Sequence, residues 1–235
     1  MPLFDEIENR QLSIPLYDMR CGIVVGVGGV GSWVAFDLAM SGQVEHLIMI
    51  DPDLVESSNL NRTPFRVADI GAHKVDVLQY LILQRRALDI TTFREKTNPD
   101  LIRKIQEILN TEANGDPEVI CIIDCRDDVY TDMYHLPGKY YKIGYDGTEI
   151  TIDGNPKETP VWGDATGYRT IPSFICSAQL GANLEVTDLL TVKEKPKKSD
   201  GYQADDHGRL NSVITFDSKD IMRFLSNSNS TTGAK

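Results

Sequence analysis

Residues 26–32 combine glycines and a serine in a pattern that can bind phosphate. Gly26, Gly28 and Gly31 have the spacing G-x-G-x-x-G, and Gly29 adds a second glycine beside Gly28. In such a turn the first glycine permits a tight bend, the second lets the backbone approach a phosphate, and the third lets helix and strand pack closely. The N-terminus of the following helix offers free N–H groups and a positive dipole end to an anion. The pattern predicts a nucleotide-phosphate site, and alone it fits NAD, FAD, ATP or a purely structural turn.

Charged and amide side chains follow two further apolar runs. Asp51 ends the run 47–50, 20 residues beyond Gly31, where a Rossmann-like fold places an acid that accepts hydrogen bonds from ribose hydroxyls. A dinucleotide site explains the glycines and Asp51, but it does not explain the remaining set: Asn59, Arg62, Lys74 and Asp127. Arginine and lysine neutralise phosphate charge and a carboxylate holds Mg²⁺, so this set indicates a triphosphate with a metal.

Lys74 is predicted in the first turn of a helix, where the helix dipole favours anions. A lysine at that position suits a site that holds an anion. A solvated surface lysine is the structural alternative.

A sheet with flanking helices is needed to bring these residues together. Buried apolar runs alternate with helical patterns, which predicts an α/β fold with a Rossmann-like, mostly parallel sheet and helices on both faces. The strands are expected at 21–25, 45–51, 91–97 and 119–124, and the helices at 32–41, 73–88, 100–110 and 172–190, with a short helix to about residue 136. In the C-terminal half, alternating runs at 139–145 and 148–153 predict a hairpin, so antiparallel strands extend the sheet.

The length of 235 residues suits one large domain with appendages. We expect a nucleotide-binding domain over 1–192, a charged linker over 193–211, a small strand–helix extension over 212–225 and a disordered tail over 226–235.

Charge and composition narrow the function. The net charge of −11 argues against nucleic-acid binding, because phosphate neutralisation needs a basic surface. No apolar run approaches the roughly 18 residues of a membrane span, and the acidic N-terminus does not resemble a signal peptide, so we expect a cytoplasmic protein without membrane contact. The four cysteines form no C-x-x-C pair, so we expect no zinc.

Taken together, the motifs resemble the ThiF/MoeB/HesA family, the bacterial relatives of ubiquitin-activating enzymes. The matching motifs are G-x-G-G-x-G-S over 26–32, D-x-D-x-V-E-x-x-N-L-x-R over 51–62, Lys74, and D-C-x-D over 124–127. The resemblance covers roughly residues 22–136 and is weaker through 172–190.

The resemblance implies an ATP- and Mg²⁺-dependent adenylation. A carboxylate, usually the C-terminal glycine of a small ubiquitin-like carrier protein or peptide, attacks the α-phosphate of ATP, and pyrophosphate leaves as an acyl-adenylate forms. The implied nucleotide-binding residues are Gly26, Gly28, Gly29, Gly31, Asp51, Asp53, Asn59, Arg62 and Lys74. Of these, Gly28 and Gly29 approach the phosphates, Asp51 takes the ribose, and Asn59, Arg62 and Lys74 bind the triphosphate, while Asp127 binds Mg²⁺. The implied catalytic set is Arg62, Lys74, Asp127 and Arg10.

This chain differs from the family pattern at Arg10 and in the position of its cysteines. Arg10–Gln11 resembles a family pair whose arginine reaches the triphosphate of the other subunit in a homodimer, but the distance from Arg10 to Gly26 is shorter than in the family. Many relatives carry a cysteine that takes the acyl group, yet the loop 155–171 has none. Cys176 lies in an apolar run and is interpreted as core, so we expect adenylation without an enzyme thioester.

Two other functions remain open on the sequence. An NAD-dependent oxidoreductase would use the same glycine turn, although no convincing substrate domain follows it. A non-catalytic partner-binding homologue is the other alternative, although retention of Arg62, Lys74 and Asp127 argues against decay of the site.

Overall fold

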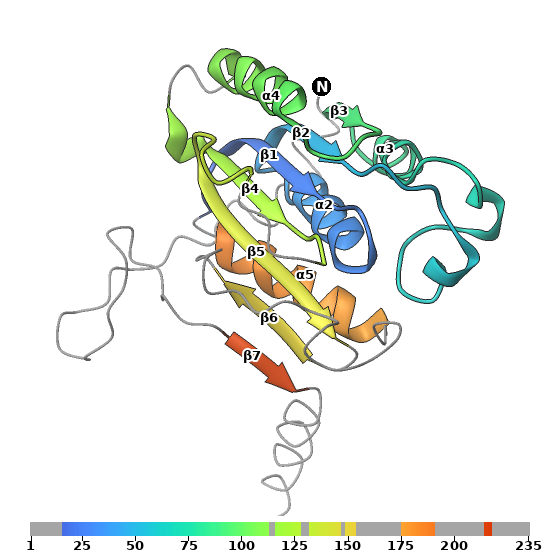
Figure 1. Ribbon diagram of the computed structural model, residues 1–235. Coiled ribbons are helices and arrows are strands. Elements are labelled where there is room, and N and C mark those ends of the chain that lie inside the picture. The colour runs from blue at the N-terminus through green and yellow to red at the C-terminus, as the bar shows by residue number, and fades with distance from the viewer. Residues whose placement is uncertain are drawn as a thin grey trace, which may run out of the picture.

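The computed structural model describes residues 16–112, 116–127, 132–146, 149–153, 175–190 and 214–217. In these residues the strands form one sheet in the order β3-β2-β1-β4-β5-β6-β7 (Figure 1). The strands are β1 (Met19–Val25), β2 (Val44–Ile50), β3 (Asp89–Phe93), β4 (Ile120–Asp124), β5 (Lys139–Asp146), β6 (Glu149–Asp153) and β7 (Ile214–Asp217). The α-helices are α2 (Gly29–Ser41), α3 (Lys74–Leu83), α4 (Pro99–Glu112) and α5 (Ile175–Leu190).

The parallel part of the sheet is built on the apolar strand β1. It pairs in parallel with β2 on one side and β4 on the other, and β3 and β5 continue the parallel order outward. This order, 3-2-1-4-5, is that of a Rossmann-like fold, which confirms the predicted fold class. Beyond β5 the structure pairs β6 and then β7 antiparallel to their neighbours.

Helices cover both faces of the sheet, as predicted. The apolar sides of α2, α3 and α5 pack on one face, against alternate residues such as Val24, Leu47 and Ile123. The opposite face, with Ile23 and Ile48, is covered by α4. Both sides of the central strands are therefore removed from water, which explains their near-continuous apolar sequence.

Two predicted boundaries and part of one predicted helix were wrong. The helix expected at 73–88 ends at Leu83, because Ile82 is its last buried residue and the exposed residues 83–85 add no packing against the sheet. The strand expected at 91–97 lies at Asp89–Phe93, because Phe93 pairs with the last residue of β2 and no partner strand continues beyond it. Residues 132–135 form turns and 136 a bend where the last part of the short helix was expected, and the first part, at 128–131, lies outside the described residues.

Several predictions lie outside the described residues. These are Arg10, the loop 155–171, the linker 193–211 and the tail 226–235. Within the described residues, no helix is long and apolar enough to cross a membrane.

Helix α2 carries an acidic residue in a poorly solvated position. Asp37 Oδ2 is buried without a hydrogen-bond partner among the described residues, and burial raises the pKa of this carboxyl from 3.8 to about 6. A carboxyl whose pKa is raised by folding stabilises the protein below the unfolded pKa, and this contribution is lost as pH rises through the folded pKa.

We therefore expect Asp37→Asn to stabilise the protein at neutral pH. The free energy of unfolding should rise by about 1–2 kcal/mol at pH 8 and by less at pH 4. The expected rise allows for the partial exposure of the Asp37 carboxyl, since solvent screens its charge. Urea denaturation at the two pH values checks this. An equal change at both would show that ionisation of Asp37 is not the cause.

Candidate functional site

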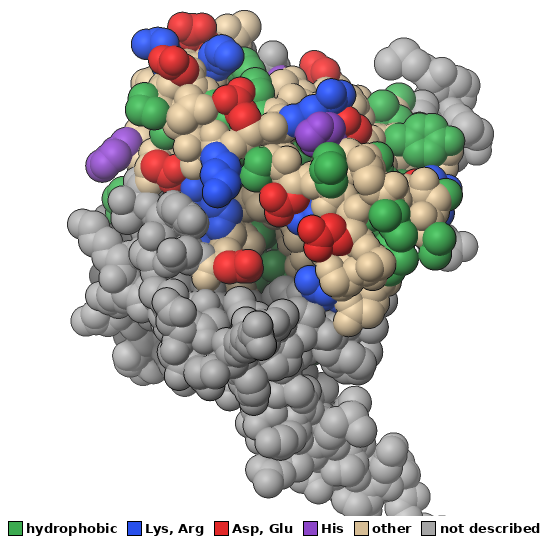
Figure 2. All heavy atoms as spheres, turned by 45° about the vertical axis from the view of Figure 1, so that its right-hand side comes forward, with side chains coloured by type: hydrophobic (Ala, Val, Ile, Leu, Met, Phe, Trp, Pro, Cys, Tyr) green, Lys and Arg blue, Asp and Glu red, His purple; other side chains and the backbone are tan. Residues whose placement is uncertain are grey.

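A pocket of about 510 Å³ opens at the carboxyl ends of the parallel strands. Its lining comes from the ends of β1, β2 and β4 and from the connection between β3 and α4. The polar and charged residues of this lining are Asp51, Asp53, Lys74, Glu95, Lys96, Thr97, Arg126, Asp127 and Asp132, and Gly26 and Gly28 line it as well. Acidic and basic side chains are also intermixed on the face seen in Figure 2. The predicted crevice therefore exists, and it brings together six of the predicted residues: Gly26, Gly28, Asp51, Asp53, Lys74 and Asp127.

The glycines have the backbone geometry that the turn requires. Gly26 has a φ of 85°, which L side chains rarely adopt. A Cβ at Gly31 would lie 1.9 Å from the carbonyl oxygen of Gly26, so only glycine lets α2 start this close to β1. A Cβ at Gly28 would meet nothing within 4 Å, so the backbone is open on that side.

The N-terminus of α2 is electrostatically suited to an anion. No side chain caps this helix at Gly28, and its first turn holds no acidic residue. The first N–H groups of a helix have no intrahelical partner, and the helix dipole adds partial positive charge there. Gly28, the residue that directly precedes these donors, lines the pocket.

Asp51 joins the end of β2 to the glycine turn. Its Oδ2 accepts a hydrogen bond from the Val27 N–H at 2.6 Å and its Oδ1 accepts one from the Asp53 N–H at 2.8 Å. Burial raises the pKa of the Asp51 carboxyl, and the Lys74 ammonium and these two N–H groups oppose the rise. Asp51 thus holds the turn in place, and its contact with a ribose remains a prediction that would use the other lone pairs of the carboxylate.

Lys74 is not a solvated surface residue. It is buried at the start of α3, and its Nζ forms an ion pair with Asp53 Oδ2 at 2.9 Å. Its side chain is 10% exposed while that of Asp53 is 63% exposed, so Asp53 can turn to solvent when an anion takes its place.

Asn59 and Arg62 do not line the pocket. They lie on the connection between β2 and α3, which projects at the right of Figure 1. Asn59 Oδ1 accepts the Glu56 N–H at 3.0 Å, and the Arg62 guanidinium donates to the Ser58 carbonyl and to Asn61. The Arg62 Nε is buried without a partner among the described residues. Their contact with a triphosphate remains a prediction.

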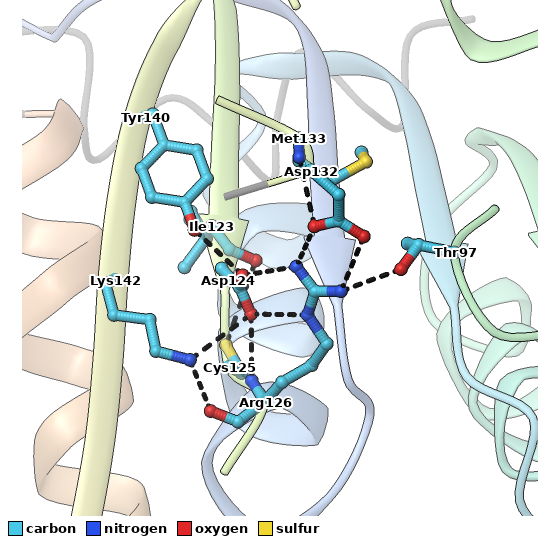
Figure 3. A network of polar contacts seen from close by, with 9 residues as sticks. All are labelled: Thr97, Ile123, Asp124, Cys125, Arg126, Asp132, Met133, Tyr140 and Lys142. Carbon is cyan, nitrogen blue, oxygen red and sulfur yellow. Dashed lines mark hydrogen bonds and ion pairs between the residues drawn. The ribbon is translucent and has the colours of Figure 1, made fainter. Parts of the chain in front are cut away.

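Sequence reasoning missed the polar network around Arg126 (Figure 3). The guanidinium forms ion pairs with Asp124 at 2.6 Å and with Asp132 at 2.7 Å. Tyr140 and Lys142 of β5 contact the same Asp124. The sequence indicated Asp124 only as the first residue of the D-C-x-D motif over 124–127. Its pairing with Lys142 depends on strands that are neighbours in space, which local spacing does not reveal.

Burial and hydrogen bonding set the protonation of this network. Burial lowers the pKa of the Lys142 ammonium, and the adjacent Asp124 carboxylate opposes that shift. Burial and the charge of Asp124 both raise the pKa of the Tyr140 hydroxyl. Burial would raise the pKa of Asp132, but hydrogen bonds from Arg126 outweigh it and leave that pKa lowered. Asp132 therefore stays ionised beside the Arg126 guanidinium.

Asp127 lies at the rim of the pocket and differs from its acidic neighbours. It is exposed, and no hydrogen bond or ion pair engages its carboxylate within the described residues. No group of three or more metal-ligating side chains exists in the described part of the chain. Mg²⁺ usually takes one or two carboxylates with phosphate and water ligands, so a single free carboxylate fits a metal that arrives with a triphosphate.

The comparison with known protein families agrees with this geometry. The profile of the ThiF family matches residues 15–136, from the strand before the glycine turn through Asp127. The chain belongs to the ThiF family.

Sequence relatives of this ThiF-family chain include proteins of two kinds. A tRNA threonylcarbamoyladenosine dehydratase 2 of Saccharomyces cerevisiae is 35% identical over 180 residues, which are 74% of this chain and 32% of the yeast protein. A ubiquitin-like modifier-activating enzyme 5 of Bombyx mori is 34% identical over 141 residues, which are 56% of this chain and 35% of the relative. The chain thus spans about a third of the length of these curated relatives.

Solved structures share the ThiF-family fold. Escherichia coli MccB, crystallised with ATP, superimposes with a TM-score of 0.53 at 20% identity, covering 78% of this chain and 56% of MccB. PaaA gives a TM-score of 0.54 at 22% identity over 85% of this chain and 64% of that protein. At these identities the superpositions establish the fold.

Proposed function

We propose that this ThiF-family domain adenylates a carboxylate with ATP and Mg²⁺ and releases pyrophosphate. One observation carries the proposal: Gly28 at the uncapped start of α2, Lys74, and Asp127, whose carboxylate has no partner within the described residues, line one pocket. A triphosphate with Mg²⁺ needs anion donors, a cation and a metal ligand. A dinucleotide needs neither the lysine nor the free carboxylate.

The residues proposed to bind ATP and Mg²⁺ have distinct roles in this reaction. The N–H groups of Gly28 and Gly29 approach the phosphates, Lys74 leaves Asp53 and neutralises phosphate charge, and Asp127 holds Mg²⁺. When bound, ATP supplies an α-phosphate that the carboxylate attacks and a pyrophosphate leaving group. The protein contributes positioning and charge neutralisation, which this chemistry needs more than a covalent group on the enzyme. Asn59 and Arg62 contribute to the triphosphate site, and Arg10 reaches the site from the other subunit of a homodimer.

The substrate we propose is the C-terminal carboxylate of a peptide or of a small ubiquitin-like carrier protein. The Bombyx relative is named as an activating enzyme for a ubiquitin-like modifier, and MccB has been solved with MccA. We place the reaction in the cytoplasm.

A second substrate class is favoured by the yeast relative, whose name places its substrate on tRNA. A carboxylate carried by tRNA would need the same nucleotide pocket. The net charge of −11 opposes close approach of a polyanion, so we favour the peptide or carrier protein.

We further propose that no enzyme thioester forms. The described cysteines Cys21, Cys121 and Cys125 are buried, and a buried thiol in apolar surroundings is a poor nucleophile. The side chain of Cys176 is not among those that the structure describes. Mass spectrometry under non-reducing conditions tests this directly, and a thiol-sensitive carrier adduct at Cys176 would overturn it.

Calorimetric titration tests the nucleotide and the metal ligand together. The wild-type protein should bind ATP more tightly with Mg²⁺ than without it, and Asp127→Ala should lose about 10-fold or more of that Mg²⁺-dependent gain, because it removes the proposed carboxylate ligand of the metal. Lys104→Ala, on the exposed side of α4, is the control. Binding of NADH without ATP would instead favour an oxidoreductase, and binding of neither nucleotide would favour a non-catalytic partner-binding domain.

A further inference from the structure

Every donor of the Arg126 guanidinium is already used within the protein (Figure 3). Nε donates to Asp124 Oδ1 at 3.0 Å, and Nη2 donates to Asp124 Oδ2 at 2.6 Å and to Asp132 Oδ1 at 2.7 Å. Nη1 donates to Thr97 Oγ1 at 2.8 Å and to Asp132 Oδ2 at 3.1 Å. An arginine side chain has five N–H donors, and these five contacts match them. Arg126 lines the pocket, yet it has no donor left for a phosphate.

These contacts fix the connections that form one side of the pocket. Asp124 ends β4, Asp132 follows it along the chain, and Thr97 belongs to the connection between β3 and α4. Arg126 therefore ties three separate segments to one point, immediately before Asp127 in the sequence.

The neighbouring strand β5 holds the same point from the other side. Lys142 is 1% exposed, and its Nζ donates to the carbonyl oxygen of Arg126 and contacts Asp124 at 3.5 Å. Tyr140 donates to Asp124 Oδ2 at 2.8 Å. The peptide group that joins Arg126 to Asp127 is thus held through its carbonyl oxygen by a buried cation.

Among the three carboxylates at 124, 127 and 132, the network also decides which one is left for a cation. Asp124 and Asp132 are both paired with Arg126, whereas within the described residues the Asp127 carboxylate has no partner. A carboxylate that is already paired with a guanidinium attracts a metal ion less than a free one does, since its negative charge is balanced.

We propose that Arg126 is a positioning residue: it neutralises Asp124 and Asp132 and, with Lys142, holds the backbone so that Asp127, and not Asp124 or Asp132, takes the Mg²⁺ that accompanies the triphosphate. The inference rests on the proposed function and adds to it. Arg126 acts through Asp127 and does not touch the nucleotide.

A double-mutant cycle on the full chain tests this inference by calorimetry with ATP, with and without Mg²⁺. We expect Arg126→Lys to weaken Mg²⁺–ATP binding about 5- to 100-fold, because a lysine cannot span both carboxylates, and to change Mg²⁺-free ATP binding less than about threefold. In an Asp127→Asn background the same substitution should have almost no further effect, since residues that act through one another are not additive. Arg94→Lys, which alters an exposed ion pair with Asp76, is the matched control.

The outcomes separate the inference from the proposed function. If Arg126→Lys weakens binding as much in the Asp127→Asn background as in the wild type, Arg126 supports the pocket in general and the inference is wrong. If wild-type protein shows no Mg²⁺-dependent ATP binding, the proposed function fails and the inference fails with it.

A milder variant keeps the test decisive where Arg126→Lys does not fold. Asp132→Asn keeps the shape of the side chain, which is 29% exposed, and removes only one charge from Arg126. We expect it to weaken Mg²⁺–ATP binding less than Asp127→Asn does. A loss equal to or larger than that of Asp127→Asn would make Asp132 a metal ligand and would overturn the inference.

Discussion

Replacing Lys74 by methionine is expected to weaken ATP binding about 10- to 150-fold, which is the effect of one charge-assisted contact of about 1.5–3 kcal/mol. Methionine keeps the unbranched shape of the buried stem and removes only the ammonium that faces the pocket. Isothermal titration with Mg²⁺–ATP measures the change, and Lys104→Met on the exposed side of α4 is the matched control.

The partner of Lys74 distinguishes a binding role from a structural one. Asp53→Asn breaks the same ion pair but leaves the ammonium in place and removes a negative charge near the phosphates. If Lys74 binds the triphosphate, Asp53→Asn should lose less ATP affinity than Lys74→Met does. If both variants and the wild type bound ATP with equal affinity, Lys74 would have only a structural role, as the ion-pair partner of Asp53.

The largest expected effect on stability comes from Gly31→Ala. The new methyl group would lie 1.9 Å from the Gly26 carbonyl oxygen, which belongs to the backbone and cannot move aside without displacing the turn. We expect the free energy of unfolding to fall by about 3 kcal/mol or more, since overpacking against backbone is among the costly substitutions. Chemical denaturation followed by circular dichroism measures this change.

Gly28→Ala is the matched control for that substitution. Its methyl group would meet nothing within 4 Å, so stability should change by no more than about 1 kcal/mol, as for alanine at a helix N-cap. ATP affinity should nevertheless fall, because the methyl group enters the pocket where a phosphate approaches the backbone. Equal loss of stability in the two variants would show that the contact with Gly26 is not the cause.

The sequence predicts best those features that depend on local geometry. The roles of Gly26 and Gly31 in the turn follow from chain stereochemistry, and the structure has a positive φ at one and a forbidden Cβ position at the other. The apolar runs of β1, β2 and β4 predict a parallel sheet because both of its faces are buried. The crevice at the strand ends then follows from the topology.

Features that depend on contacts between distant segments could not be predicted in the same way. The end of β3 depends on where β2 ends, and the contact of Lys142 with Asp124 depends on β5 lying beside β4. The pairing of Arg126 with Asp132 and Thr97 likewise joins connections that are separate along the chain. Asn59 and Arg62 lie outside the pocket because of the path that the connection between β2 and α3 takes. The sequence motif alone does not determine that path.

Exchange of labelled pyrophosphate into ATP is the measurement that tests the central claim most directly, because only a reversible adenylation of a substrate returns pyrophosphate to ATP. The account predicts exchange that depends on Mg²⁺, on a peptide or carrier protein with a free C-terminal carboxylate, and on Asp127, and that disappears when the carboxylate is amidated. If exchange instead required a modified tRNA, the substrate would be a nucleic acid and the adenylation chemistry would be unchanged. Tight Mg²⁺–ATP binding without exchange for any carboxylate substrate would contradict the claim that this pocket adenylates.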